Sequence, residues 1–179
     1  MKFYKIILFL LLISNAHSNE KFKLKKITDL NNPWSMTFLN NEEIMISDKE
    51  GQIQNINLKN KTINKVNHNL NYKVDGQGGL LEILKHKNNI YLCYTEDRGS
   101  GKTSTSIAKA KYTKDNLNFK NIFQANPPIN SGYHFGCRMV IQDDKYLYAS
   151  IGERGGGNIA QDFNQHPGSI IKINLDGSV

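Results

Sequence analysis

The chain has 179 residues, of which 39% are hydrophobic and 22% charged, and its formal net charge is +7 at pH 7. The basic residues are scattered, without Lys/Arg runs or RNA-binding aromatic motifs, which argues against nucleic acid as a partner. Two cysteines are too few for a disulfide scaffold, and their spacing does not suit a metal site.

The first 18 residues have the features of a secretory signal peptide. Lys2 and Lys5 precede an apolar run over residues 6–13, and Ala16 and Ser18 are small residues before the expected cleavage site. The run is too short to span a bilayer unless the segment is retained as an anchor. Cleavage after Ser18 leaves 21 basic and 16 acidic side chains, a net charge of +5. We expect a periplasmic or secreted protein with no membrane span after cleavage.

After the signal peptide, strand periodicity dominates and a helical pattern is almost absent. Short runs of β-branched and aromatic residues alternate with turns rich in Asn, Asp and Gly. The pattern predicts an all-β chain of short antiparallel strands. The predicted strands, in chain order, are residues 35–39, 44–47, 80–84, 90–95, 107–112, 139–142, 146–151 and 169–174.

The strand pattern repeats along the chain. A strand, a polar turn and a second strand occur over residues 33–48, 79–94 and 136–150, and the second strands begin 46 and 56 residues apart. This period suits the four-stranded antiparallel blades of a β-propeller with loop insertions. Residues 19–179 are thus predicted to form an incomplete propeller of about two and a half to three blades. Because propellers close with about four to eight blades, we expect a fragment or an assembly with other chains.

The repeat also predicts where unusual residues lie. Pro33-Trp34, residues 76–79 and residues 134–136 immediately precede the first strand of each repeat. In a propeller that strand is the innermost of its blade, so these positions gather at one end of the central channel. We therefore expect Gln77 and His134 to face a common site.

A histidine, an arginine and a glutamate lie at the ends of two neighbouring predicted strands. His134 and Arg138 belong to the run 133–138, and Glu153 lies in the glycine-rich run 152–157. Imidazole titrates near neutral pH, and a carboxylate on its far nitrogen fixes its tautomer, as a general base requires. The simpler interpretation is a hydrogen-bonded histidine at a strand end. Arg138 is interpreted as a structural support that braces Glu153 or a backbone carbonyl.

These motifs, in this order, resemble the soluble glucose/sorbosone dehydrogenase family over residues 28–179, the N-terminal half of the family domain. Members are quinoprotein aldose sugar dehydrogenases, six-bladed propellers that use pyrroloquinoline quinone (PQQ) and calcium. The motifs that carry the resemblance are Pro33-Trp34, Gly76-Gln77-Gly78-Gly79-Leu80-Leu81, His134-Phe135-Gly136-Cys137-Arg138, Gly152-Glu153 and Ile171-Lys172-Ile173-Asn174-Leu175-Asp176-Gly177.

The resemblance implies roles for individual residues. His134 would be the general base that takes the proton from the anomeric hydroxyl of an aldose as hydride passes to the quinone. Glu153 would orient and polarise His134, Gln77 would contact the cofactor, and Asn158 is placed within reach of the site. Most PQQ and calcium ligands would belong to later blades, so no metal ligand is assigned in this chain, and the electron acceptor is not identified.

Two alternatives to the dehydrogenase remain open at this stage: a non-catalytic propeller that binds carbohydrate or protein, and an inactive fragment with aggregation-prone blade edges. The state of Cys93 and Cys137 is also open. Each lies in an apolar strand pattern, where a disulfide and a buried free thiol are both compatible with an oxidising compartment.

Overall fold

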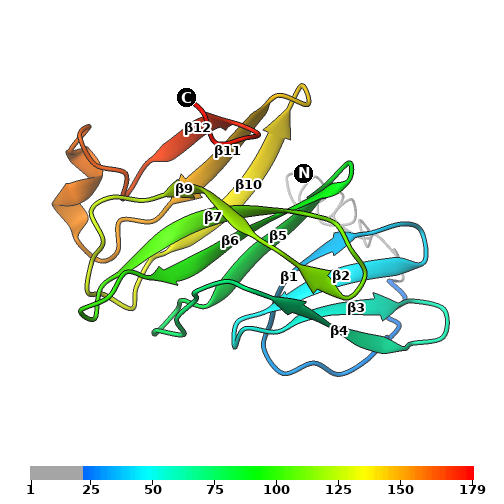
Figure 1. Ribbon diagram of the computed structural model, residues 1–179. Helices are drawn as coiled ribbons and strands as arrows, with labels where there is room; N and C mark the ends of the chain where they lie inside the picture. The colour runs from blue at the N-terminus through cyan, green and yellow to red at the C-terminus, as the bar shows by residue number, and fades with distance from the viewer. Residues whose placement is uncertain (1–21) are drawn as a thin grey trace, which may run out of the picture.

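The structure, a computed structural model, describes residues 22–179, so the predicted signal peptide lies outside the described residues. Three sheets, mainly antiparallel, lie side by side in chain order (Figure 1). No helix within residues 22–179 is long and apolar enough to cross a membrane.

In each sheet, the first strand along the chain is the one that lies closest to the neighbouring sheets. The first sheet has the order β1 (Pro33–Phe38), β2 (Glu43–Asp48), β3 (Ile53–Asn57) and β4 (Ile63–His68), with β8 (Asn116–Leu117) parallel to the edge of β4. The second has β5 (Leu80–His86), β6 (Asn89–Asp97), β7 (Thr103–Lys111) and β9 (Lys120–Gln124). The third has β10 (Gly136–Gln142), β11 (Tyr146–Ile151) and β12 (Ile170–Asn174), with the 3-10 helix η1 (Gly157–Gln161) between β11 and β12.

The three sheets are successive blades of a β-propeller. The first strands of the blades, β1, β5 and β10, lie next to one another, β5 contacting both of the others, as innermost strands do. The prediction of an incomplete propeller with antiparallel blades is therefore confirmed.

One hydrophobic core lies at each seam between blades. On β6, Ile90 and Leu92 point into the core shared with the first blade, whereas Tyr91 and Cys93 point into the core shared with the third. All four side chains are fully buried, because both faces of the second blade are covered. A strand buried on both faces has a continuous apolar sequence, which explains why β6 is so readily predicted.

The first two strands of every blade were predicted, whereas the later strands were predicted only in part. The eight predicted runs correspond to β1, β2, β5, β6, β7, β10, β11 and β12, with shifts of up to four residues at their ends. The strands β3, β4, β8 and β9, and the helix η1, were not predicted. Most residues of β4 are exposed, so its sequence lacks the apolar alternation that marks a half-buried strand.

Pro33-Trp34 was expected to precede the first strand of its repeat, and this is wrong. The strand β1 begins at Pro33, which pairs with Asp48, and the register shifts between Pro33 and Ser35. The bulge lets pairing with β2 continue to the proline.

Short polar side chains of β1 and β2 bond to β5, the innermost strand of the second blade. Ser47 Oγ donates a 2.6 Å hydrogen bond to the carbonyl of Leu81, and Thr37 Oγ1 accepts one of 3.0 Å from the backbone N–H of Lys85. Neighbouring inner strands belong to different sheets, so their facing backbone groups have no ladder partner. Hydroxyl groups supply the partners that burial of these groups demands.

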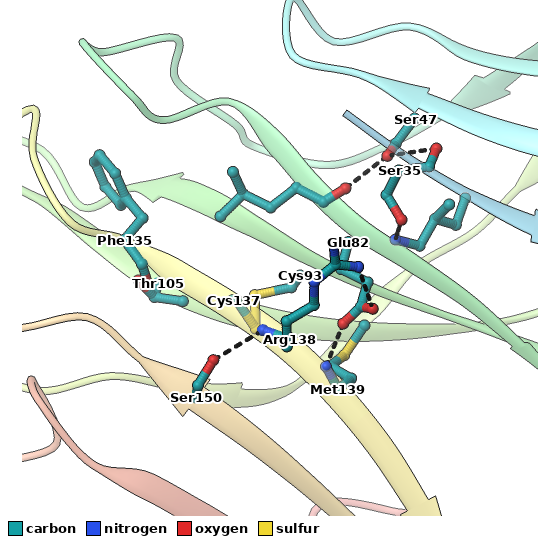
Figure 2. The surroundings of a disulfide bond; sticks show 12 residues. Ser35, Ser47, Glu82, Cys93, Thr105, Phe135, Cys137, Arg138, Met139 and Ser150 are labelled. Carbon is teal, nitrogen blue, oxygen red and sulfur yellow. Dashed lines mark hydrogen bonds and ion pairs between the residues drawn. A yellow bond between two sulfur atoms is a disulfide. The ribbon is translucent and has the colours of Figure 1, made fainter. Parts of the chain in front are cut away.

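Cys93 on β6 and Cys137 on β10 form a disulfide, with Cα atoms 6.4 Å apart (Figure 2). The bond links the second blade to the third. It settles the question that the sequence left open, in favour of pairing.

We predict that replacing both cysteines by alanine lowers the free energy of unfolding by about 4 kcal/mol, because the disulfide closes a 44-residue separation in the unfolded chain. Urea unfolding of the oxidised chain and the double variant measures the difference. A reductant should shift the midpoint of the unaltered chain and leave the double variant unaffected; equal midpoints with and without reductant would contradict the prediction.

Candidate active site

His134 lies in the loop directly before β10, and Gln77 lies in the equivalent loop before β5. The backbone N–H of His134 donates a 2.9 Å hydrogen bond to Oε1 of Gln77. Gln77 in turn donates its backbone N–H to the carbonyl of Gly132, at 2.8 Å. At Gly76, where φ is +55°, a Cβ would lie 2.4 Å from that same carbonyl, so only glycine allows the two loops to approach so closely. The structure therefore brings Gln77 and His134 together.

Glu153 follows the end of β11 and reaches the imidazole from the third blade. His134 Nδ1 and Glu153 Oε1 are in direct hydrogen-bond contact. The same carboxylate oxygen accepts the backbone N–H of Gly155 at 3.2 Å. The hydrogen bond from His134 is the main cause that lowers the pKa of Glu153 below its usual value.

The arrangement fixes which imidazole nitrogen is available. Glu153 is ionised at neutral pH because its pKa is lowered, and a carboxylate only accepts hydrogen bonds. The proton in the contact therefore belongs to Nδ1 of His134, which leaves the lone pair of the neutral imidazole on Nε2. The His134 side chain is 52% exposed, so Nε2 is accessible to a substrate. The pair has the geometry of a general base held by a carboxylate.

Arg138 does not brace Glu153, and that expectation is wrong. Its Nη1 lies 3.2 Å from Oε1 of Glu82 on β5, and its backbone N–H donates to Ser150 Oγ at 2.9 Å (Figure 2). The other oxygen of Glu82 accepts the backbone N–H of Met139. Arg138 pairs with Glu82 because β5 and β10 are neighbouring inner strands, whereas Glu153 lies beyond the end of β11. Glu82 thus joins two blades, a role that the sequence analysis missed.

Asn158 lies exposed on η1 and makes no hydrogen bond to His134, Gln77 or Glu153. Its position as a cofactor contact stays a prediction.

Two cavities open along the inner strands, of about 550 and 410 Å³. Trp34 and Arg138 line both, and Gly136 and Cys137 line the smaller. His134 lines neither of them.

Residues 22–179 contain no group of three or more His, Cys, Asp or Glu side chains that could hold a metal ion.

The fold and the site together define a propeller protein with an imidazole–carboxylate pair at one end of its channel. The family model for Glucose / Sorbosone dehydrogenase matches residues 30–179, and the chain belongs to that family.

Relatives support the same conclusion. The chain is 25% identical to the aldose sugar dehydrogenase YliI of Escherichia coli (strain K12) over 84% of its own length and 43% of the relative's. It is 26% identical to quinoprotein glucose dehydrogenase B of Acinetobacter calcoaceticus, covering 90% of this chain and 41% of that one. The PQQ-bound structure of an aldose sugar dehydrogenase from Streptomyces coelicolor is 25% identical with a TM-score of 0.73, covering 84% and 46%. The chain thus spans less than half the length of these relatives.

We predict that the Glu153 carboxyl titrates at a higher pH in His134→Ala than in the unaltered chain. Because pairing lowers the carboxyl pKa, the contact contributes stability above the ordinary carboxyl range and loses it as the pH falls through the lowered pKa. Carbon-13 NMR of the labelled carboxyl follows the titration. Identical curves in the two proteins would show that the imidazole does not hold Glu153.

Proposed function

We propose that the chain is the N-terminal part of a periplasmic or secreted quinoprotein that oxidises the anomeric hydroxyl of an aldose. In this proposal residues 1–18 are the signal peptide, residues 19–179 belong to the propeller domain, and His134 is the general base. The observation that carries the proposal is the His134–Glu153 pair, which leaves Nε2 of an exposed imidazole free. Family membership supports the choice of reaction.

In the proposed reaction, Nε2 of His134 takes the proton of the anomeric hydroxyl. Glu153 stays ionised, stabilises the imidazolium that forms and keeps the ring in orientation. PQQ, when bound, supplies the acceptor for the hydride that leaves the anomeric carbon. The side-chain oxygen of Gln77 accepts the backbone N–H of His134 and so helps to hold the residue in place.

The donor groups of this chain fit an anionic quinone in part. The Gln77 side chain uses its oxygen on His134, which leaves its amide N–H groups as donors, and Asn158 offers an exposed amide on η1. Amide N–H groups suit carboxylate and quinone oxygens. No step of the proposal depends on calcium.

The first experiment measures dye-linked oxidation of aldoses by the purified mature chain and by a version extended with the missing blades, with and without added PQQ and calcium. Quinone-dependent activity in either protein supports the proposal. If both are silent while a sugar or protein ligand binds without PQQ, the propeller is a binding protein. Silence with aggregation would instead mark an inactive fragment.

In an active protein, we predict that His134→Ala reduces kcat by about 10²- to 10⁴-fold, the usual contribution of a general base, and leaves PQQ binding intact. Glu153→Gln should slow turnover strongly, because a neutral amide does not stabilise the imidazolium. Steady-state kinetics and a quinone-binding titration measure the two effects separately. Undiminished turnover in His134→Ala would remove this residue as the base.

A further inference from the structure

Arg154, next to Glu153, is a buried arginine to which the sequence analysis gave no role. It is only 3% exposed, and all three nitrogens of its guanidinium are engaged. Burial lowers the pKa of Arg154 to about 10, which still leaves it charged at neutral pH. Burying a charge is costly unless hydrogen bonds compensate, and here the hydrogen bonds from all three nitrogens provide that compensation.

The guanidinium holds the loop that carries His134. Nε donates to the carbonyl of Tyr133 at 3.0 Å, and Nη2 donates to the carbonyl of Ser131. The backbone N–H of Arg154 donates to the carbonyl of His134 at 3.3 Å. The guanidinium carbon lies 3.7 Å from the centre of the Phe135 ring. The arginine thus contacts the loop on both sides of the histidine.

The same side chain anchors the loop to the second blade. Nη1 donates to the carbonyl of Thr103 on β7 at 3.0 Å, and Nη2 donates to Thr103 Oγ1 at 2.8 Å. A planar fork with several donors makes this set of contacts, whereas a lysine ammonium on a flexible stem does not reproduce it.

We propose that Arg154 is a positioning residue that keeps the imidazole of His134 in register with Glu153. Glu153 and Arg154 are consecutive, so one backbone segment presents the carboxylate and clamps the loop of its partner. The inference rests on the proposed role of His134 as the base, but the contact that it explains exists without substrate or quinone.

The test reads the tautomer of His134 in the chain itself by NMR with nitrogen-15-labelled histidine, at mildly alkaline pH where imidazole is neutral. The His134→Ala spectrum assigns the signals. In the unaltered chain the Nδ1-protonated form should dominate, because Glu153 accepts that proton. In Arg154→Lys and Arg154→Met, the ratio of the Nδ1 to the Nε2 form should fall by about tenfold, the value of one net hydrogen bond.

Two further variants separate positioning from general stability. Arg98→Lys is the matched control. Arg98 Nη1 donates a 3.2 Å hydrogen bond to Ser104 Oγ, which lies on β7 beside Thr103, and this contact does not involve the His134 loop. It should leave the tautomer ratio unchanged. Thr103→Val keeps Arg154 and removes one of its anchors, so it should shift the ratio in the same direction by a smaller factor.

An unchanged ratio in a folded Arg154 variant would overturn the inference, as would an equal shift in Arg98→Lys. Where neither Arg154 variant folds, Thr103→Val decides by shifting the ratio or leaving it unchanged. The readout needs neither sugar nor PQQ, so its failure is distinct from failure of the dehydrogenase assay. A tautomer that responds in a protein without activity would keep the positioning role and remove the catalytic one.

Discussion

The seam between the second and third blades is the constraint on which the candidate site depends. Hydrogen bonds from Thr105 and Arg154 fix the backbone on either side of His134. Further along β10, the Cys93–Cys137 disulfide and the Glu82–Arg138 ion pair connect the same two blades. The catalytic geometry is thus a property of how two blades meet, since neither blade alone contains both Gln77 and Glu153.

Close packing at this seam supports one side of the candidate site, and the other side is exposed to solvent. Phe135 is buried beside His134, whereas the His134 ring is about half exposed. A base must be held firmly and still reach its substrate. The loop before β10 meets both needs, because Phe135 packs into the core between the blades while the neighbouring His134 ring stays half exposed.

The sequence predicted the strands with long apolar patterns, and it missed β3, which is largely buried but rich in Asn and Gln. Strands such as β6 and β11 pack against neighbouring blades, so their apolar patterns are long and clear. The outer strand β4 faces solvent along most of its length and has a polar sequence that resembles a loop. Its pairing is specified by the strand beside it, and that information is absent from a local pattern.

The site divides in the same way. The meeting of Gln77 and His134 follows from their equivalent positions in the repeat, and the contact with Glu153 follows from the neighbouring ends of β10 and β11. The partner of Arg138 was missed because it lies on the inner strand of another blade. The partners of Arg154 were missed because an arginine in a polar, glycine-rich run looks solvated. Only the tertiary structure shows that Arg154 is buried against carbonyls from two separate segments.

The contacts of His134 also bear on the proposed reaction. The contacts that hold the His134 loop come from two adjacent blades within residues 22–179. In our proposal, the Gln77 side chain serves both the base and the cofactor, because its oxygen holds the backbone of His134 while its amide N–H groups remain as donors. The base is assembled by local packing before any cofactor arrives, so its geometry can be measured in this chain independently of catalysis.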